Sequence, residues 1–275
     1  MVSLLRKIAL FTLLTMLTQI GGIAYLLYQP ISKYCHRKSS GIRRIGTKIL
    51  GFSTIYLFLS LVIVPPIAIK MGRVPLPYFA SSKIPLQPQT LLTCLANRHY
   101  VRKELALITT DLAKALRKEF PQTTVNYLDA NFPFWDGFPL LPHLSHNDGK
   151  KLDLAFFYKD KATGKPVQTS PSFMGYGVCE SPKKGELNQP AICAKEGFFQ
   201  YSLLEKITPQ WNKQKMPLDE QRTKRLLILL AESRKIRKIF IEPHLKKRWG
   251  LSKFPKIRFH GCHAVRHDDH IHLQL

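Results

Sequence analysis

The chain has 275 residues, of which 45% are hydrophobic, so one domain of ordinary size can be accompanied by membrane segments. The formal net charge of +24 favours polyanionic surroundings such as nucleic acid, anionic lipid or an acidic cell-wall polymer. Neither a DNA-binding motif nor a clustered aromatic signature of RNA binding is present, so nucleic acid is not an expected partner. A solvated basic face without a dedicated partner is the simpler explanation of the charge.

Two apolar segments near the amino end are predicted to cross a bilayer. Residues 8–28 and 49–69 are each 21 residues long and contain no charged side chain. A cleaved signal peptide is the alternative for the first segment, because Arg6 and Lys7 precede it, but no small-x-small cleavage pattern follows. Pro65-Pro66 is predicted to end the second helix.

The charges around these segments predict their orientation. Two basic residues precede the first span, whereas the loop between the spans is rich in them: Lys33, Arg37, Lys38, Arg43, Arg44 and Lys48. Because positive loops stay in the cytoplasm, both termini are expected outside it. Residues 1–73 are therefore predicted to form a membrane anchor, with the rest of the chain in the periplasm or on the cell surface.

After the anchor, residues 74–92 contain four prolines and no acidic residue, which predicts an extended linker. The folded domain is then expected over 93–275. Apolar residues at helical spacing predict a helix over 102–120. Strands are predicted over 123–128, from β-branched and aromatic content, and over 152–158, from an apolar run.

The remainder mixes helices and strands without regular alternation. Residues 160–200 show turn signals and little periodicity, and are interpreted as an inserted loop region. A basic helix is predicted over 221–236, a strand over 238–241, a short helix over 243–249 and a final strand over 270–275. The expected fold class is α+β, with a small antiparallel sheet and flanking helices.

Four of the five cysteines fall in the outer part of the chain. Cys35 lies in the predicted cytoplasmic loop, and an even number in an oxidising compartment suggests two disulfides. Cys179 with Cys193 is the most local pairing, which leaves Cys94 with Cys262. Unpaired thiols are the alternative.

Six histidines crowd two short segments: His143, His146, His263, His267, His270 and His272. A turn containing Gly149 separates His146 from Asp153, so a hairpin can bring both to one metal. His270 and His272 are two apart, and on a strand both point to the same face, one to bind metal and the other to act beside it. Histidines that merely titrate on a solvated terminus are the alternative.

Both segments carry a resemblance. HLSHNDGKKLD at 143–153 and HDDHIHL at 267–273 resemble the paired motifs of the penicillin-insensitive murein endopeptidases. That family belongs to a zinc peptidase group with lysostaphin-type, D-Ala-D-Ala carboxypeptidase and hedgehog-like members. The resemblance covers about residues 95–275, strongly only at the two motifs. It implies one Zn²⁺ per chain, bound by His146, Asp153 and His272.

The resemblance also implies roles for three further histidines. His270 would carry protons beside the metal, and His143 and His267 would be catalytic residues that stabilise the tetrahedral oxyanion. The expected function is hydrolysis of amide bonds in peptidoglycan peptide cross-links, by a zinc metallopeptidase anchored in the bacterial inner membrane with a periplasmic catalytic domain. The segment 160–200 has no counterpart in the family.

Three alternatives stay open. The first is a D-Ala-D-Ala carboxypeptidase or dipeptidase, which would need a cation to hold the free carboxylate. The second is a non-catalytic zinc-containing domain that binds the cell wall, although a structural site would not need His143, His267 or His270. The third is a membrane-tethered protein whose basic face binds an anionic cell-wall polymer.

Overall fold

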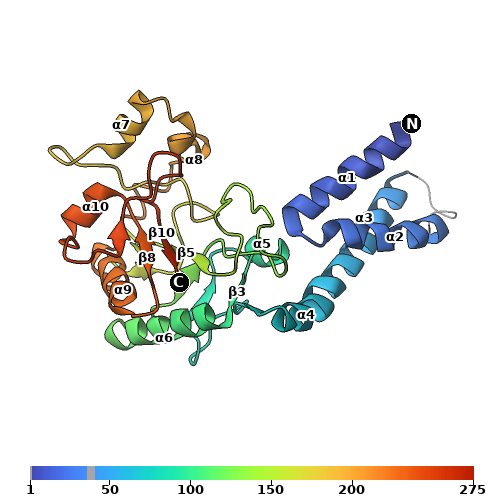
Figure 1. The fold of residues 1–275 in the computed structure, drawn as a ribbon, viewed down its shortest axis with the longest axis horizontal. Helices are drawn as coiled ribbons and strands as arrows, with labels where there is room; N and C mark the ends of the chain where they lie inside the picture. The colour runs from blue at the N-terminus through green and yellow to red at the C-terminus, as the bar shows by residue number, and fades with distance from the viewer. Residues whose placement is uncertain (1, 36–40) are drawn as a thin grey trace.

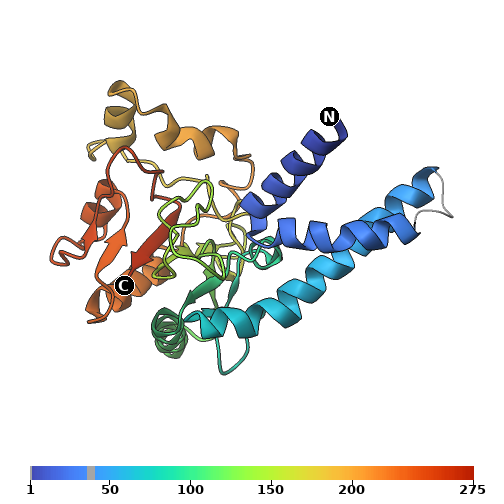
Figure 2. The same cartoon turned by 45° about the vertical axis from the view of Figure 1, so that its right-hand side comes forward.

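A helical arm projects from an α+β domain (Figures 1 and 2). The computed structural model describes residues 2–35 and 41–275. The arm consists of α1 (Val2–Thr18), α2 (Gly21–Cys35), α3 (Gly41–Phe58), the π-helical turn η2 (Leu59–Ile63) and α4 (Val64–Lys70). The mixed helices and strands of the domain confirm the predicted fold class.

The prediction of one continuous span over residues 8–28 is wrong, because the helix breaks between α1 and α2. Gln19 has a φ of 66°, and the amide N–H of Gly21 donates to Thr18 Oγ1 at 2.8 Å. A Cβ at Gly22 would lie 2.1 Å from Thr15 Oγ1. The glycines thus allow the two helices to approach closely, and the segment folds into a hairpin.

The second predicted span is a continuous helix from Gly41 to Lys70, and among the described residues it is the one helix long and apolar enough to cross a membrane. The prediction that Pro65 and Pro66 end this helix is wrong, because both lie in the first turn of α4. Proline cannot donate to a carbonyl four residues back, and its ring crowds that carbonyl. The π-helical turn η2 directly before them accommodates this.

The segment expected as a linker is part of the folded domain. β1 (Arg73–Pro75) pairs with β3 (Tyr100–Arg102), and β2 (Leu86–Pro88) pairs in parallel with β4 (Val125–Tyr127). The short helix α5 (Leu91–Leu95) follows. Proline is tolerated here because β2 is an edge strand, which needs fewer backbone donors.

The main sheet has six strands in the order β2-β4-β5-β10-β8-β9. Its remaining members are β5 (Lys151–Ala155), β10 (His270–Gln274), β8 (Lys238–Phe240) and β9 (Ile257–Arg258). The central strands are antiparallel, but β2 with β4 and β8 with β9 are parallel pairs, so the sheet is mixed rather than antiparallel as predicted. The three predicted helices are α6 (Lys103–Glu119), α9 (Glu220–Glu232) and α10 (Pro243–Arg248).

The sheet and helices share one buried core. Leucines from both long helices and from the central strands meet in it: Leu105, Leu116, Leu226, Leu230, Leu154 and Leu273. The predicted strand over 152–158 ends early, at Ala155, because the N–H of Phe157 donates to Thr223 Oγ1 rather than to a neighbouring strand. β6 (Tyr158–Lys159) instead pairs with β7 (Pro166–Val167) in a separate two-stranded sheet.

A cap of short helices covers one side of the sheet (Figure 1). It contains α7 (Gln189–Lys195), the 3₁₀ helix η3 (Phe199–Ser202) and α8 (Leu203–Ile207), all within or beside the segment expected to be an irregular insertion. A disulfide between Cys193 and Cys262 ties α7 to the segment before β10. Both predicted pairings are therefore wrong.

The two remaining cysteines of the domain are free and buried. Cys94 lies in the core, where its sulfur is 3.3 Å from Tyr127 Oη, and Cys179 is 2% exposed. The predicted pairing favoured cysteines close in the sequence, whereas the disulfide joins residues 69 positions apart. Cys35 lies at the end of α2, and its side chain is outside the described set.

Candidate metal centre

The two central strands bring their polar side chains to one place. In the antiparallel register of β5 and β10, His272 lies opposite Asp153 and His270 lies opposite Ala155. Residues two apart on a strand share a face, so His270 and His272 point to the same side of the sheet as Asp153. This is the geometry that the spacing of the final strand predicted.

His146 reaches the same point from the loop before β5. Its Nδ1 lies 2.7 Å from the carbonyl oxygen of Ala130, which leaves Nε2 facing the strands. The loop turns back into β5 at Gly149, whose φ of 78° favours glycine, and the N–H of Gly149 donates to Asn131 Oδ1 at 3.0 Å. The expected turn between His146 and Asp153 thus exists.

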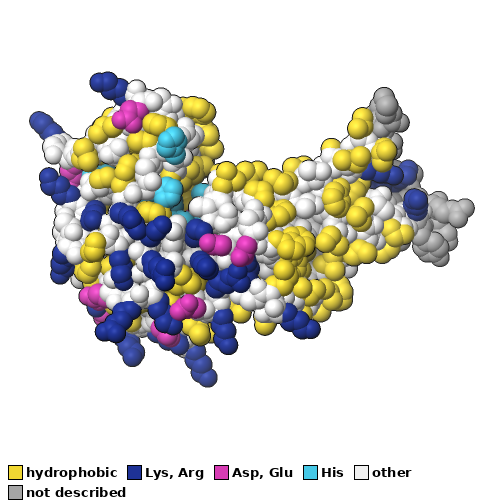
Figure 3. Space-filling view, in the orientation of Figure 1, with side chains coloured by type: hydrophobic (Ala, Val, Ile, Leu, Met, Phe, Trp, Pro, Cys, Tyr) yellow, Lys and Arg dark blue, Asp and Glu magenta, His cyan; other side chains and the backbone are white. Residues whose placement is uncertain are grey.

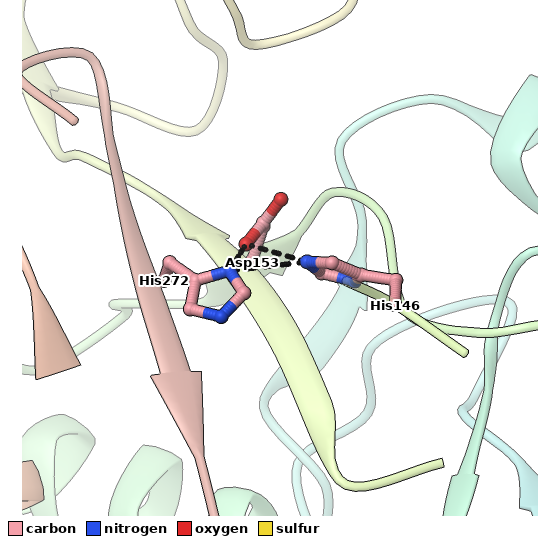
Figure 4. A group of neighbouring side chains, drawn as sticks. All are labelled: His146, Asp153 and His272. Carbon is pink, nitrogen blue, oxygen red and sulfur yellow. Dashed lines mark hydrogen bonds and ion pairs between the residues drawn. The ribbon is translucent and has the colours of Figure 1, made fainter. Parts of the chain in front are cut away.

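His146, Asp153 and His272 converge through one ligand atom each (Figure 4). Asp153 Oδ1 lies 3.3 Å from His146 Nε2 and 2.8 Å from His272 Nδ1, and the two nitrogens are 3.1 Å apart. Ligand atoms about 2.1 Å from a tetrahedral zinc lie roughly 3.4 Å from one another. All three side chains are at most 3% exposed. The group could therefore hold a metal ion.

Outer contacts fix each of these side chains. The hydroxyl of Tyr176 donates to Asp153 Oδ2 at 2.7 Å, so the carboxylate keeps Oδ1 directed at the histidines. The side-chain amide of Gln274 lies 2.9 Å from His272 Nε2. Sequence reasoning missed Tyr176, because it lies in the segment without periodicity.

Two of the three side chains are in the protonation state that binds metal. Burial by itself raises the pKa of Asp153, but the charges of His146 and His270 outweigh it and hold that pKa well below its usual value. Burial lowers the pKa of His272 to about 4, so this imidazole is neutral. An ionised carboxylate and neutral imidazole are the forms that bind metal. Burial lowers the pKa of His146, but Asp153 and Asp129 raise it more, so His146 must release a proton when metal binds.

His270 lies beside the candidate metal group and offers no ligand atom to it. Its Nδ1 is hydrogen-bonded to Asp269 Oδ1, and Asp269 Oδ2 accepts from the N–H of Gly177. His270 Nε2 lies 3.9 Å from Asp153 Oδ2, on the side of the candidate metal group. Burial lowers the pKa of His270, but Asp269 and Asp153 raise it more, to about 9. A histidine oriented by a carboxylate is a typical general acid and base.

His143 and His267 lie close to the group: the His143 ring is centred 5.6 Å from that of His146, and the His267 ring 5.8 Å from that of His272. His143 Nδ1 lies 2.9 Å from Asp129 Oδ2, and Asp129 is also paired with Arg98 at 2.7 Å. His143 Nε2 is buried and has no protein partner among the described residues. The ring of His267 is centred 4.9 Å from that of His270, and burial together with the charge of His270 holds its pKa well below the usual value.

All six predicted site residues line one cavity of about 340 Å³. His260 and His263 also line it, and the ring of His260 is centred 5.7 Å from that of His267. Histidine side chains are visible near the cap in Figure 3. Sequence reasoning gave no role to His260, which lies outside the two motifs.

A second cavity of about 480 Å³ adjoins the first across Pro142, His143 and Leu204. Its walls are mostly apolar and include the exposed side chains of Phe173 and Trp211. Exposed aromatic side chains around a hollow are typical of ligand-binding grooves. The apolar cavity thus lies directly beside the cavity that contains the metal group.

The disulfide is predicted to keep the cap closed over the cavity, because it ties α7 to the segment carrying His260 and His263. Replacing Cys193 and Cys262 together by alanine should lower the stability of the cap, by about 4 kcal/mol for a loop of this length. Limited proteolysis should then cut the cap faster, while the bound metal stays unchanged. A Cys94→Ala variant, which removes a free thiol, is the control, and equal proteolysis of both variants would contradict the prediction.

Glu242 predicts a pH dependence of stability. This buried carboxyl accepts from the Tyr201 hydroxyl at 2.5 Å and from the His267 N–H at 3.2 Å. Burial and the nearby Asp268 charge raise its pKa to about 7. The folded state therefore holds a proton that the unfolded state releases near pH 4.5, so stability should fall as pH rises from about 4.5 to about 7.

The Glu242→Gln variant should lose this part of the pH dependence, because the amide mimics the protonated acid. We expect it to be more stable than the natural chain above pH 7 by about 1–3 kcal/mol, and close to it at pH 4.5. Urea unfolding at both pH values measures the difference. Parallel pH profiles for the two proteins would show that Glu242 is already ionised when folded.

Comparisons with known proteins do not assign the chain to a family. No protein-family model matches the chain. No curated protein matches it either.

Proposed function

We propose that the chain is a zinc metallopeptidase that hydrolyses amide bonds in peptidoglycan peptide cross-links. The convergence of His146, Asp153 and His272 beside the carboxylate-oriented His270 carries this proposal. The resemblance of the two motifs to murein endopeptidases supports the choice of zinc and of substrate class. Two histidines and one carboxylate with a position left for water are a common catalytic zinc set.

Each side chain has a task in this reaction. His146, Asp153 and His272 would hold a zinc ion, which would supply an activated water and polarise the scissile carbonyl. With a zinc ion on Asp153, the carboxylate charge that helps to raise the pKa of His270 would be offset. His270 Nε2 would then take a proton from the attacking water and return it to the departing amine nitrogen as the C–N bond breaks.

His143 Nε2 has no protein partner in the described part of the chain. Because Nδ1 donates to Asp129, Nε2 would donate to the oxygen that becomes negative when the His143 ring carries both protons. Asp269 holds the His270 ring in place.

The proposal places the domain outside the cytoplasm, with Gly41–Lys70 crossing the bacterial inner membrane. The Cys193–Cys262 disulfide supports an oxidising compartment. The strongly basic composition suits an anionic cell wall as the environment of the substrate.

The test uses the full chain purified in detergent. Metal analysis should find one zinc per chain, and incubation with cross-linked muropeptides should give monomers that are heavier by one water in total. Absence of zinc, or zinc without any cleavage, would overturn the enzyme proposal, and the second result would favour a wall-binding domain. Loss of one terminal D-Ala, with cross-links intact, would indicate a carboxypeptidase instead.

A further inference from the structure

The closed end of the α1–α2 hairpin lies against the domain. Gln19, at the turn, is 1% exposed, and its Oε1 accepts from the N–H of Phe134 at 2.8 Å. Ile20 beside it packs with Val64, Ala68 and Tyr100 in a small buried cluster. The turn thus joins the domain to the end of the long helix.

The long helix docks on the same region through polar contacts. The amide of Asn97 donates to Tyr56 Oη at 2.9 Å and to Ser60 Oγ at 3.2 Å, and the Tyr56 hydroxyl donates to the carbonyl of Leu95. Asn97 directly follows the C-cap residue of α5 and has a φ of 56°, a left-handed conformation that asparagine tolerates. The domain therefore holds the half of the helix from Tyr56 to Lys70.

The other end of the arm is the basic end. The amino terminus and the ends of α2 and α3 that face each other lie away from the domain in Figures 1 and 2. Basic residues of the described helices occur at these ends: Arg6, Lys7, Lys33, Arg43, Arg44 and Lys48.

Between the basic end and the domain, the arm exposes apolar side chains to its surroundings (Figure 3). Members of all three long helices are exposed: Leu10, Leu13, Leu17, Leu26, Leu27, Leu57 and Leu61. A folded arm that leaves such side chains uncovered needs an apolar partner. Acyl chains with anionic headgroups at the basic end match both the surface and the charge.

We infer that α1, α2 and the Gly41–Lys70 helix form a three-helix membrane anchor whose amino terminus lies in the cytoplasm. Basic ends stay on the cytoplasmic side, so the hairpin starts and finishes there, and its turn at Gln19 meets the domain on the outer side. The sequence had suggested the reverse position for the amino terminus. The inference rests on the membrane placement proposed above, but not on hydrolysis.

Helix lengths further indicate that the domain enters the outer leaflet. At 1.5 Å per residue, the 17 residues of α1 span about 25 Å and the 15 of α2 about 22 Å, against a hydrocarbon core of about 30 Å. Beside the Tyr56 contact, α5 exposes Leu91, Leu92 and Leu95 by 45–47%. If these leucines of α5 lie in the outer leaflet, the domain fills the part of the hydrocarbon core that α1 and α2 are too short to span.

Cysteine labelling in spheroplasts tests the topology. In a Cys35→Ser background, Ser3→Cys and Thr47→Cys variants should react with a membrane-impermeant maleimide only after permeabilisation, whereas Ser82→Cys should react before it. Labelling of Ser3→Cys together with protection of Thr47→Cys in intact spheroplasts would contradict the hairpin and restore the predicted single crossing by residues 8–28. Labelling of all three variants in intact spheroplasts would show that the arm does not cross the membrane. The proposal of hydrolysis would be unaffected, because the muropeptide assay tests it separately.

The position of α5 is tested in nanodiscs. An environment-sensitive dye on a Leu92→Cys variant should be quenched several-fold more by lipids with a spin label near the headgroup than the same dye on Phe199→Cys. Phe199 is 74% exposed and lies in η3 of the cap. Equal quenching at the two positions would show that α5 stays in water.

Discussion

Replacing His272 by alanine is expected to remove the metal and to lower kcat/KM by about 10³-fold or more. The substitution deletes one of three converging ligand atoms and leaves Asp153 with His146 alone. Two ligands hold a transition metal weakly, and the loss of several kcal/mol of metal-supplied stabilisation corresponds to this factor. Zinc per chain, measured after gel filtration, is the direct readout.

His263→Ala is the matched control for this result, because His263 lines the same cavity but offers no atom to the ligand group. It should keep one zinc per chain. Full metal content in His272→Ala would show that other residues hold the ion. Deleting the carboxyl-terminal residues is a poorer test, since β10 lies inside the six-stranded sheet and its loss would disturb the fold itself.

Each half of the metal group could be predicted, because its residues lie close together in the sequence. Alternation along a strand places His270 and His272 on one face regardless of the rest of the fold, and a turn at Gly149 returns the chain from His146 to Asp153. What the sequence did not contain was the register that sets His272 opposite Asp153. That pairing joins residues far apart, and only the two motifs together suggested it.

The outer contacts of the site were not predictable in the same way. Tyr176 reaches Asp153 from a segment with no periodic pattern, and Asp129 reaches His143 from the end of a strand on the other side of the loop. Asp269 stood inside the second motif, but its contact with the His270 ring depends on side-chain directions that spacing does not fix. These partners are tertiary and need the fold.

The arm shows a signal that composition hides. An uncharged run of 21 residues predicts a span by hydropathy alone, yet Gln19 followed by Gly21 and Gly22 interrupts it at the centre. A polar residue before two glycines is a turn signal, and giving it weight would have predicted a hairpin. The prolines of 74–92 predicted a linker, but this segment forms strands of the folded domain, because edge strands such as β2 tolerate proline.

Replacing His270 by alanine is expected to leave the zinc in place while lowering kcat by about 10²–10⁴-fold, the usual contribution of a positioned acid–base group. His270 is bonded to Asp269 and offers no atom to the ligand group, so the ion keeps its three protein partners. Asp269→Asn is the graded control. It retains the imidazole and weakens only its orientation, so its loss should be smaller, as partners of a catalytic unit are not equivalent. Loss of zinc in His270→Ala would make His270 a ligand, and unchanged kcat with full zinc would assign the proton transfer to another residue of the cavity.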